Sequence, residues 1–290
     1  MQYSKPVTEI IKQRSSWRSY RDQPLAENIK KQLEEFMIAN NAAPFGSSAR
    51  FSLVAAKPGD SETLKGLGTY GFIKGARAFI AGAVKHSEKN LEDYGYLMEQ
   101  IILFATALGL GTCWLGGSFN KSNFSKKIGA TGDELVPAVS PVGYITEKRG
   151  VIDRLVRWGA GSKMRYPWET LFFHTNFDTP LTAQVAGAYA TSLEMVRLAP
   201  SASNKQPWRM VKELEKPIFH FYLQRSQGYQ KSGEKFNTVD LQRLDMGIAM
   251  CHFELSAQEM NLRGQWKIMP PAHLLLPERT EYIVSWLGEL

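Results

Sequence analysis

Two short segments of this chain gather residue types that bind anions. The first is Arg14-Ser15-Ser16-Trp17-Arg18, in which arginines flank a pair of serines. A guanidinium can hold a phosphate through two parallel hydrogen bonds, and hydroxyls add further donors. The second is the loop Pro200-Ser201-Ala202-Ser203-Asn204, which precedes Gln206-Pro207-Trp208. Both segments could bind a phosphate, although arginine-serine runs also occur on solvated surfaces and Asn204 alone would serve as a turn former.

A third cationic element lies near the middle of the chain. Lys163 and Arg165 alternate along the sequence, so both side chains point the same way if the segment is extended. They close the most densely basic stretch, which begins at Lys148 and is interleaved with apolar residues. This stretch is either an amphipathic segment with a solvated basic face or a contact with an acidic membrane surface.

Composition favours an ordinary globular protein. Of the 290 residues, 43% are hydrophobic and 22% are charged. The net charge is +7, but lysine and arginine are interrupted by acidic residues throughout, which argues against nucleic-acid binding. The apolar run from Ile101 to Gly117 is short for a membrane span and rich in glycine, so we expect a buried helix followed by a strand. No hydrophobic segment of a secretory signal follows Met1, and we expect a cytoplasmic location.

The sequence gives little indication of a metal site or of a catalytic nucleophile. The two cysteines, Cys113 and Cys251, each lie in an apolar run without a second ligand nearby, so we expect buried thiols and no metal. The five histidines are scattered, and no catalytic side chain is predicted. No dinucleotide or P-loop motif occurs. The glycine-rich run Gly66–Gly71 is a turn or, at Tyr70 and Gly71, a loop near a cofactor.

Two long helical patterns end alike. One runs from Tyr94 to Leu108 and closes with Gly109-Leu110, and the other runs from Leu244 to Met260 and closes with Asn261-Leu262. Glycine and asparagine enter the left-handed conformation most readily, so both helices should stop with the same cap before an extended segment. A constant shift in residue number, which we call the repeat offset, takes Gly109 to Asn261 and Trp114 to Trp266.

A second repeat supports the first. A helix, an Ala-Pro step, a small-residue loop and a strand follow one another from Leu33 to Ala55, and again from Leu193 to Val211. We therefore expect an α+β fold made of two related halves, residues 1–170 and 171–290, that share one core. The segment from Tyr166 to Phe173 is predicted to be a wrapping connection and not a flexible tether.

The order of these elements resembles the nitroreductase family of FMN-dependent oxidoreductases. In that family an early arginine-serine segment and a late K-x-R hold the FMN phosphate and ribityl chain, a P-S-x-x-N loop covers the ring, and a G-G or E-G step lies near flavin N5. The resemblance implies the following cofactor-binding residues here: Arg14, Ser15, Ser16, Arg18, Gly116, Gly117, Lys163, Arg165, Pro200, Ser201, Ala202 and Asn204.

One departure from the family is informative. Ordinary members are homodimers in which the arginine segment and the P-S-x-x-N loop both lie early in one polypeptide. Here the loop lies in the second half, and Pro44-Phe45-Gly46-Ser47 occupies the early position without an asparagine. The resemblance therefore implies an internal duplication that mimics the family homodimer, with one FMN per chain, a degenerate second site and a monomeric state.

The implied activity is NAD(P)H-dependent reduction of nitroaromatics, quinones or similar small electron acceptors by two successive hydride transfers. The alternative within flavin chemistry is a specialised flavoenzyme of the same fold, such as a dehydrogenase or a deiodinase-like enzyme. An alternative from a different class is a non-catalytic flavin-binding or redox-sensing protein. A basic module that binds nucleic acid or a membrane surface is a third alternative, and it would carry no chromophore.

Overall fold

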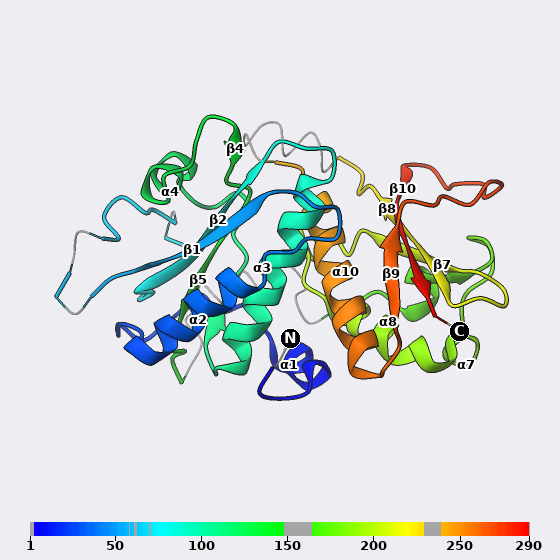
Figure 1. Ribbon diagram of the computed structural model, residues 1–290, viewed down its shortest axis with the longest axis horizontal. Coiled ribbons are helices and arrows are strands. Elements are labelled where there is room, and N and C mark those ends of the chain that lie inside the picture. The colour runs from blue at the N-terminus through cyan, green and yellow to red at the C-terminus, as the bar shows by residue number, and fades with distance from the viewer. Residues whose placement is uncertain are drawn as a thin grey trace.

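Two five-stranded sheets flank a central pair of long helices (Figure 1). The computed structural model describes residues 3–57, 59–60, 63–69, 71–147, 164–228 and 239–289. Residues 148–163 of the basic stretch and Tyr70 lie outside the described residues, so the predictions made for them stay predictions. No described helix is both long enough and apolar enough to cross a membrane.

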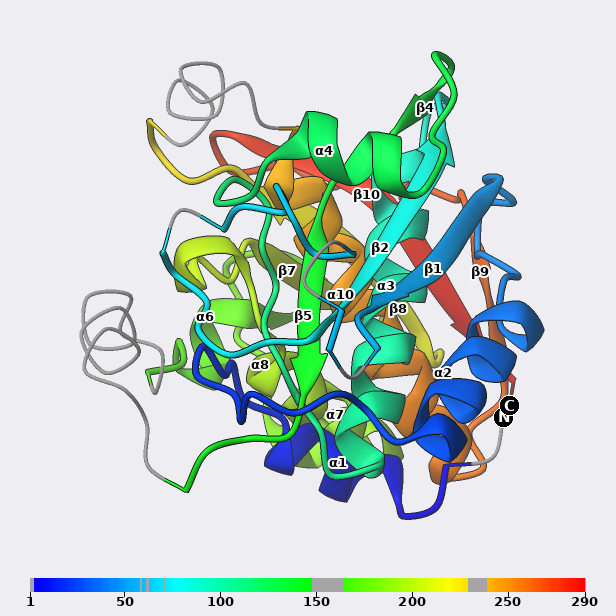
Figure 2. The same cartoon turned by 90° about the vertical axis from the view of Figure 1, so that its left-hand side faces the viewer.

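The first sheet is antiparallel. Its strands lie in the order β1 (Ala49–Ala55), β2 (Ala78–Lys85), β5 (Val139–Gly143) and β3 (Gly111–Thr112), with β4 (Glu134–Leu135) paired to β2. Every residue of β2 except Lys85 is buried, as expected for a central strand covered on both faces. Figure 2 shows β1, β2 and β5 side by side with the long helix α3 behind them, and α2 (Glu27–Ala39) and α4 (Lys121–Lys127) complete this half.

The second sheet repeats this order and adds one strand. Its strands are β6 (Phe172–His174), β7 (Trp208–Lys212), β8 (Ile218–Gln224), β10 (Thr280–Gly288) and β9 (Gly264–Lys267), with α6 (Trp168–Leu171), α7 (Ala183–Ala186) and α8 (Ala190–Leu198) beside them. The antiparallel order β7-β8-β10-β9 reproduces β1-β2-β5-β3, which confirms the predicted duplication. The added strand β6 pairs with β7 in parallel, so the segment from Tyr166 to Phe173 is packed into the second sheet and is not a flexible tether.

The two long helices are α3 (Asn90–Ala107) and α10 (Leu241–Glu259), and they pack against each other at the centre of the molecule. Both end as predicted. Gly109 has φ of +78° and Asn261 has φ of +59°. The N–H of Leu110 then donates to the carbonyl of Ala105, and the N–H of Leu262 donates to that of Ala257, so the repeat offset also holds for the capping bonds.

These matched caps allow a prediction. Gly109 and Asn261 are both exposed, so substitutions there test backbone conformation alone. Gly109→Ala should lower the free energy of unfolding by about 1 kcal/mol, because the left-handed conformation brings Cβ close to the following carbonyl. Gly109→Asn, which copies the other half, should cost less, and Asn261→Gly should stay within about 0.5 kcal/mol of the parent. Urea unfolding measures all three, and equal stability of the alanine and asparagine variants at position 109 would contradict this account.

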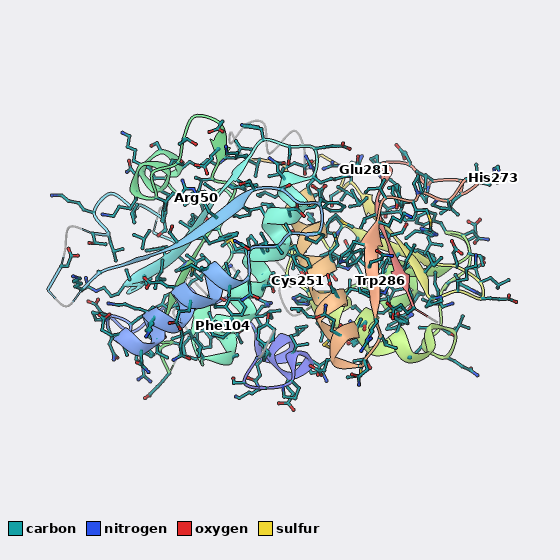
Figure 3. The ribbon with its side chains drawn as sticks, viewed as in Figure 1. Arg50, Phe104, Cys251, His273, Glu281 and Trp286 are labelled. Atoms are coloured by element: carbon teal, nitrogen blue, oxygen red, sulfur yellow. The ribbon has the colours of Figure 1, made fainter. Side chains whose placement is uncertain are left out.

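The main core lies between α10 and the second sheet. Phe253 is fully buried there and makes edge contacts with Phe221 and Trp286 at centroid distances of 5.3 Å and 5.6 Å. Cys251 lies on the same helix, at the centre of the molecule (Figure 3). Cys113 and Cys251 are both buried, and neither forms a disulfide within the described residues, which confirms the prediction of buried thiols.

Candidate functional site

Ten of the twelve predicted site residues line one cavity of about 480 Å³. They are Arg14, Ser15, Ser16, Arg18, Gly116, Arg165, Pro200, Ser201, Ala202 and Asn204. Gly117 is exposed beside Gly116 and is not among the residues that line the cavity. Lys163 lies outside the described residues. The fold thus brings the arginine-serine segment at the beginning of the chain and the loop Pro200–Asn204 of the second half to the same cavity.

The arginine-serine segment is fixed against the first sheet. Helix α1 (Val7–Gln13) buries its apolar face and ends immediately before Arg14. The chain then runs alongside β3, where Ser16 forms a bridge with Thr112 and the N–H of Trp17 donates to the Thr112 carbonyl at 2.8 Å. This pairing holds the segment at the cavity wall in one register.

A buried carboxylate supports Arg14 from behind. The Arg14 side chain is only 7% exposed, and its Nε lies 3.8 Å from Oε1 of the fully buried Glu99. Burial lowers the pKa of Arg14, and the nearby Glu99 opposes that shift. Glu99 also accepts a hydrogen bond from Nε1 of Trp114 at 2.7 Å and contacts Nε2 of His252 at 2.9 Å. One carboxylate therefore orients both a cation and an aromatic ring of the cavity wall.

The loop after α8 is conformationally strained. Ser203, Asn204 and Gln206 have φ of 50°, 54° and 46°, a conformation that costs energy in residues with a Cβ. Internal hydrogen bonds hold it, including that from the Gln206 N–H to the Ser201 Oγ at 2.8 Å. Strain of this kind persists where the surroundings fix the backbone, and it concentrates at functional sites.

Arg165 is tied to this loop. Its Nη1 donates to Oδ1 of Asn204 at 3.2 Å and its Nη2 donates to the Leu198 carbonyl at 3.1 Å. Nδ2 of Asn204 in turn donates to the Met164 carbonyl at 3.0 Å. The Asn204 amide therefore positions the segment that carries Arg165, a role that its loop motif did not reveal.

Ser203 also lines the cavity, and it belongs to the loop that the sequence singled out. The remaining lining residues were not predicted as site residues. They are Trp114, Ala138, Leu198, Leu241, Leu244, Asp245 and Ile248. Leu244 and Ile248 were recognised only as apolar positions of a helix. The repeat offset relates Asp245 to Asp93, and this match was the one sequence signal that could have marked Asp245.

Asp245 is the unusual member of this group. It is 3% exposed, and its Oδ1 accepts a hydrogen bond from the Ala202 N–H at 2.9 Å. Its Oδ2 has no hydrogen-bond partner within the part of the chain that the structure describes. Burial raises the pKa of Asp245 well above its ordinary value, the Ala202 N–H lowers it, and Asp240 raises it further.

A serine-histidine-glutamate chain occurs elsewhere and is structural. Nδ1 of His220 lies 2.7 Å from the Ser285 Oγ, and Nε2 lies 3.2 Å from Oε1 of Glu213. The Ser285 side chain is fully buried within β10, and its hydroxyl also contacts the Tyr282 hydroxyl at 2.7 Å. A substrate cannot reach a nucleophile in that position. Among the described residues, no cluster of three or more histidine, cysteine or acidic side chains could hold a metal.

Residues 6–257 match a family model described as "Putative TM nitroreductase". The structure is similar to the crystal structure of a "putative nitroreductase" from Thermotoga maritima MSB8, with a TM-score of 0.60, 20% identity, and coverage of 99% of this chain and 95% of that chain. This similarity extends over nearly the whole chain and shows the same fold.

Weaker matches involve about half of this chain. A "putative NADH dehydrogenase/NAD(P)H nitroreductase" from Parabacteroides distasonis ATCC 8503 has a TM-score of 0.40 and 22% identity, over 50% of this chain and 90% of that one. An FMN-dependent nitroreductase from Clostridium difficile R20291 has a TM-score of 0.40 and 22% identity, over 48% and 88%. No curated protein is a significant match.

Proposed function

The chain belongs to the TM nitroreductase family, and we propose that it is an FMN-dependent oxidoreductase whose cofactor site is the cavity described above. Membership of the family supports a general oxidoreductase function. The cofactor, the hydride donor and the electron acceptor are the parts that we propose. The observation that carries the proposal is that arginines from the beginning and the middle of the chain and a strained serine loop from its second half line one cavity.

The cationic part of the cavity suits a phosphate. Arg14, Arg18 and Arg165 line it together with the hydroxyl groups of Ser16 and Ser201. Charge-assisted hydrogen bonds from guanidinium groups are among the strongest contacts that a protein offers to a phosphate. By the family resemblance Lys163 would join them.

The apolar part of the cavity suits a flat ring. Trp114, Ala138, Leu241, Leu244 and Ile248 contribute to its wall. A volume of about 480 Å³ is in the usual range for cofactor pockets, which are mostly apolar with a few placed polar groups. The residues present therefore fit FMN in both charge and shape.

Bound FMN would supply the redox chemistry, taking a hydride from NADH or NADPH and passing it to a nitroaromatic, quinone or related acceptor. The chain's own residues have simpler tasks. Arg14 and Arg165 would bind and orient the phosphate, whereas Arg18 would lie near the pyrimidine end of the ring or the ribityl chain, where positive charge favours negative charge on the reduced ring. The apolar residues exclude water from the reacting face, and the backbone at Gly116 and Gly117 is proposed to lie near the ring nitrogen N5.

We also infer that residues 1–170 and 171–290 act as the two partners of a family dimer within one chain. The first half supplies the arginines, and the second supplies the loop Pro200–Asn204 and the wall of α10. The counterpart loop of the first half, at Phe45–Ser47, is bound internally, because the N–H groups of Phe45 and Ser47 both donate to Asp93. We therefore propose one FMN per chain and a monomeric enzyme.

Purification should give a yellow protein that releases FMN in a one-to-one ratio with the chain. The reason is that only one of the two loops related by the repeat combines with the arginine segment around the cavity. Extraction with acid, followed by chromatography against flavin standards, measures both identity and stoichiometry. A colourless protein that takes up no added FMN would contradict the proposal, and two FMN per chain would contradict the degenerate second site.

Turnover separates an enzyme from a flavin-binding protein. The FMN-loaded chain should oxidise NADH or NADPH when a quinone or nitroaromatic is supplied, as followed by loss of nicotinamide absorbance. Bound FMN that neither nucleotide reduces would favour a redox-sensing protein instead.

A further inference from the structure

The two halves use the same aspartate differently. The repeat offset relates Asp93 on α3 to Asp245 on α10. Both carboxyl groups bind the loop that follows the Ala-Pro step of their own half. Asp93 uses both oxygens, since Oδ1 accepts from the Phe45 N–H at 2.9 Å and Oδ2 accepts from the Ser47 N–H at 2.8 Å.

Asp245 uses only one oxygen on its loop. Oδ1 accepts a hydrogen bond from the Ala202 N–H, and no group in the described part of the chain forms a hydrogen bond with Oδ2. Asp245 lines the cavity, whereas Asp93 does not. A buried polar atom without a partner is costly, and native proteins rarely leave one unsatisfied. An oxygen kept unpaired beside a ligand cavity, where its counterpart in the other half is paired, points to a ligand as the missing partner.

The surroundings indicate which form of the carboxyl faces the ligand. Asp245 forms no ion pair with a described cation, and the arginines that line the same cavity are not among the groups that shift its pKa. The acidic Asp240 at the start of the same helix disfavours a second negative charge. An isolated buried carboxylate neutralises itself by binding a proton. The neutral group then carries an O–H donor that needs an acceptor.

We propose that Asp245 is a ligand-binding residue of this cavity, whose uncharged carboxyl donates a hydrogen bond to an oxygen atom of the bound ligand. The inference rests on the proposed function. That function offers two sources of such an oxygen, a carbonyl of the FMN ring and the carbonyl or nitro group of the electron acceptor. The chemistry recognised is the same in both cases.

Substitutions test the donor. The probes are FMN added to apo protein and a quinone or nitroaromatic added to the oxidised, FMN-loaded protein. Asp245→Asn keeps an oxygen for the Ala202 N–H and places an N–H donor at the other position, so both affinities should stay within about twofold of wild type. Asp245→Ala removes the donor and should weaken binding of one of the two probes about 2- to 12-fold, the value of one neutral hydrogen bond. The matched control Asp93→Ala removes the corresponding side chain from the first half and should leave FMN affinity unchanged. An asparagine variant that binds as weakly as the alanine variant would overturn the proposal, because it would indicate an ionised acceptor.

Infrared difference spectroscopy tests the proton directly and does not depend on turnover. The carbonyl stretch of a protonated carboxyl should be present in wild type, absent in Asp245→Asn, and shifted when the ligand binds. A shift on adding FMN assigns the acceptor oxygen to the flavin ring. A shift only when an electron acceptor is added to the oxidised, FMN-loaded protein assigns it to the acceptor.

Failure of this inference can be told from failure of the proposed function. If FMN binds but the carboxyl band is missing or never shifts, the role of Asp245 is wrong and the cofactor assignment stands. If wild type takes up no FMN in the same titration, both are wrong.

Discussion

Replacing Arg14 and Arg165 together with alanine should weaken FMN binding about 100-fold or more. Each arginine is expected to contribute a charge-assisted hydrogen bond to the phosphate, and such a bond is worth about 1.5–3 kcal/mol. A loss of about 1.4 kcal/mol corresponds to a factor of ten in affinity. The two residues line the cavity from different segments. Arg14 directly follows α1 in the sequence, and Arg165 lies beside the loop at Asn204. Titration of apo protein with FMN, followed by quenching of flavin fluorescence, measures the loss.

Arg50 provides the matched control. It lies on β1 (Figure 3) and is not among the residues that line the cavity. Its guanidinium is already bound by Glu134 at 2.8 Å and by the carbonyl groups of Ile128 and Gly129. Arg50→Ala removes one arginine charge, half of what the double variant loses, and should leave FMN affinity unchanged. Thermal unfolding checks that both proteins remain folded. A double variant that binds FMN as tightly as the Arg50 variant would show that the phosphate lies elsewhere.

Much of the site could be predicted because its chemistry is local in sequence. Arg14 to Arg18 and Pro200 to Asn204 are short segments whose residue types bind anions without reference to the rest of the fold. The helix caps were predictable for the same reason, since the conformation at Gly109 and Asn261 is a property of those residues. The repeat offset then placed the second half on the first.

The walls supplied by α10 could not be predicted in this way. Leu244 and Ile248 have the spacing of ordinary core residues, and only the folded chain shows that one end of the helix borders a cavity while the rest is covered. Asp245 lies between them in an apolar run, where an aspartate usually signals a cap or a surface position. The role of Asn204 in holding Arg165 could not be predicted either, because their hydrogen bond joins residues that only the tertiary fold brings together.

The repeat offset relates one more pair of residues, whose importance the helical periodicity of the sequence does not reveal. Gly95 on α3 corresponds to Gly247 on α10, and the two helices cross at these residues. A Cβ at Gly95 would lie 2.2 Å from the Leu244 carbonyl oxygen, and a Cβ at Gly247 would lie 1.9 Å from the Glu92 carbonyl oxygen. The glycines allow backbone to touch backbone at the contact that joins the two halves.

Gly247→Ala should therefore lower the free energy of unfolding by about 3 kcal/mol, at the upper end of overpacking costs, because the opposing atoms are backbone and cannot rotate away. Helix propensity alone predicts the opposite, a gain of about 1 kcal/mol for alanine over glycine. Urea unfolding decides between them. Gly68→Ala is the control, since Gly68 has open space around its Cβ position and no left-handed φ, and its variant should stay within about 0.5 kcal/mol of the parent. If Gly247→Ala were as stable as the parent, the helices would have room to separate and the close crossing would not be what fixes the two halves around the cavity.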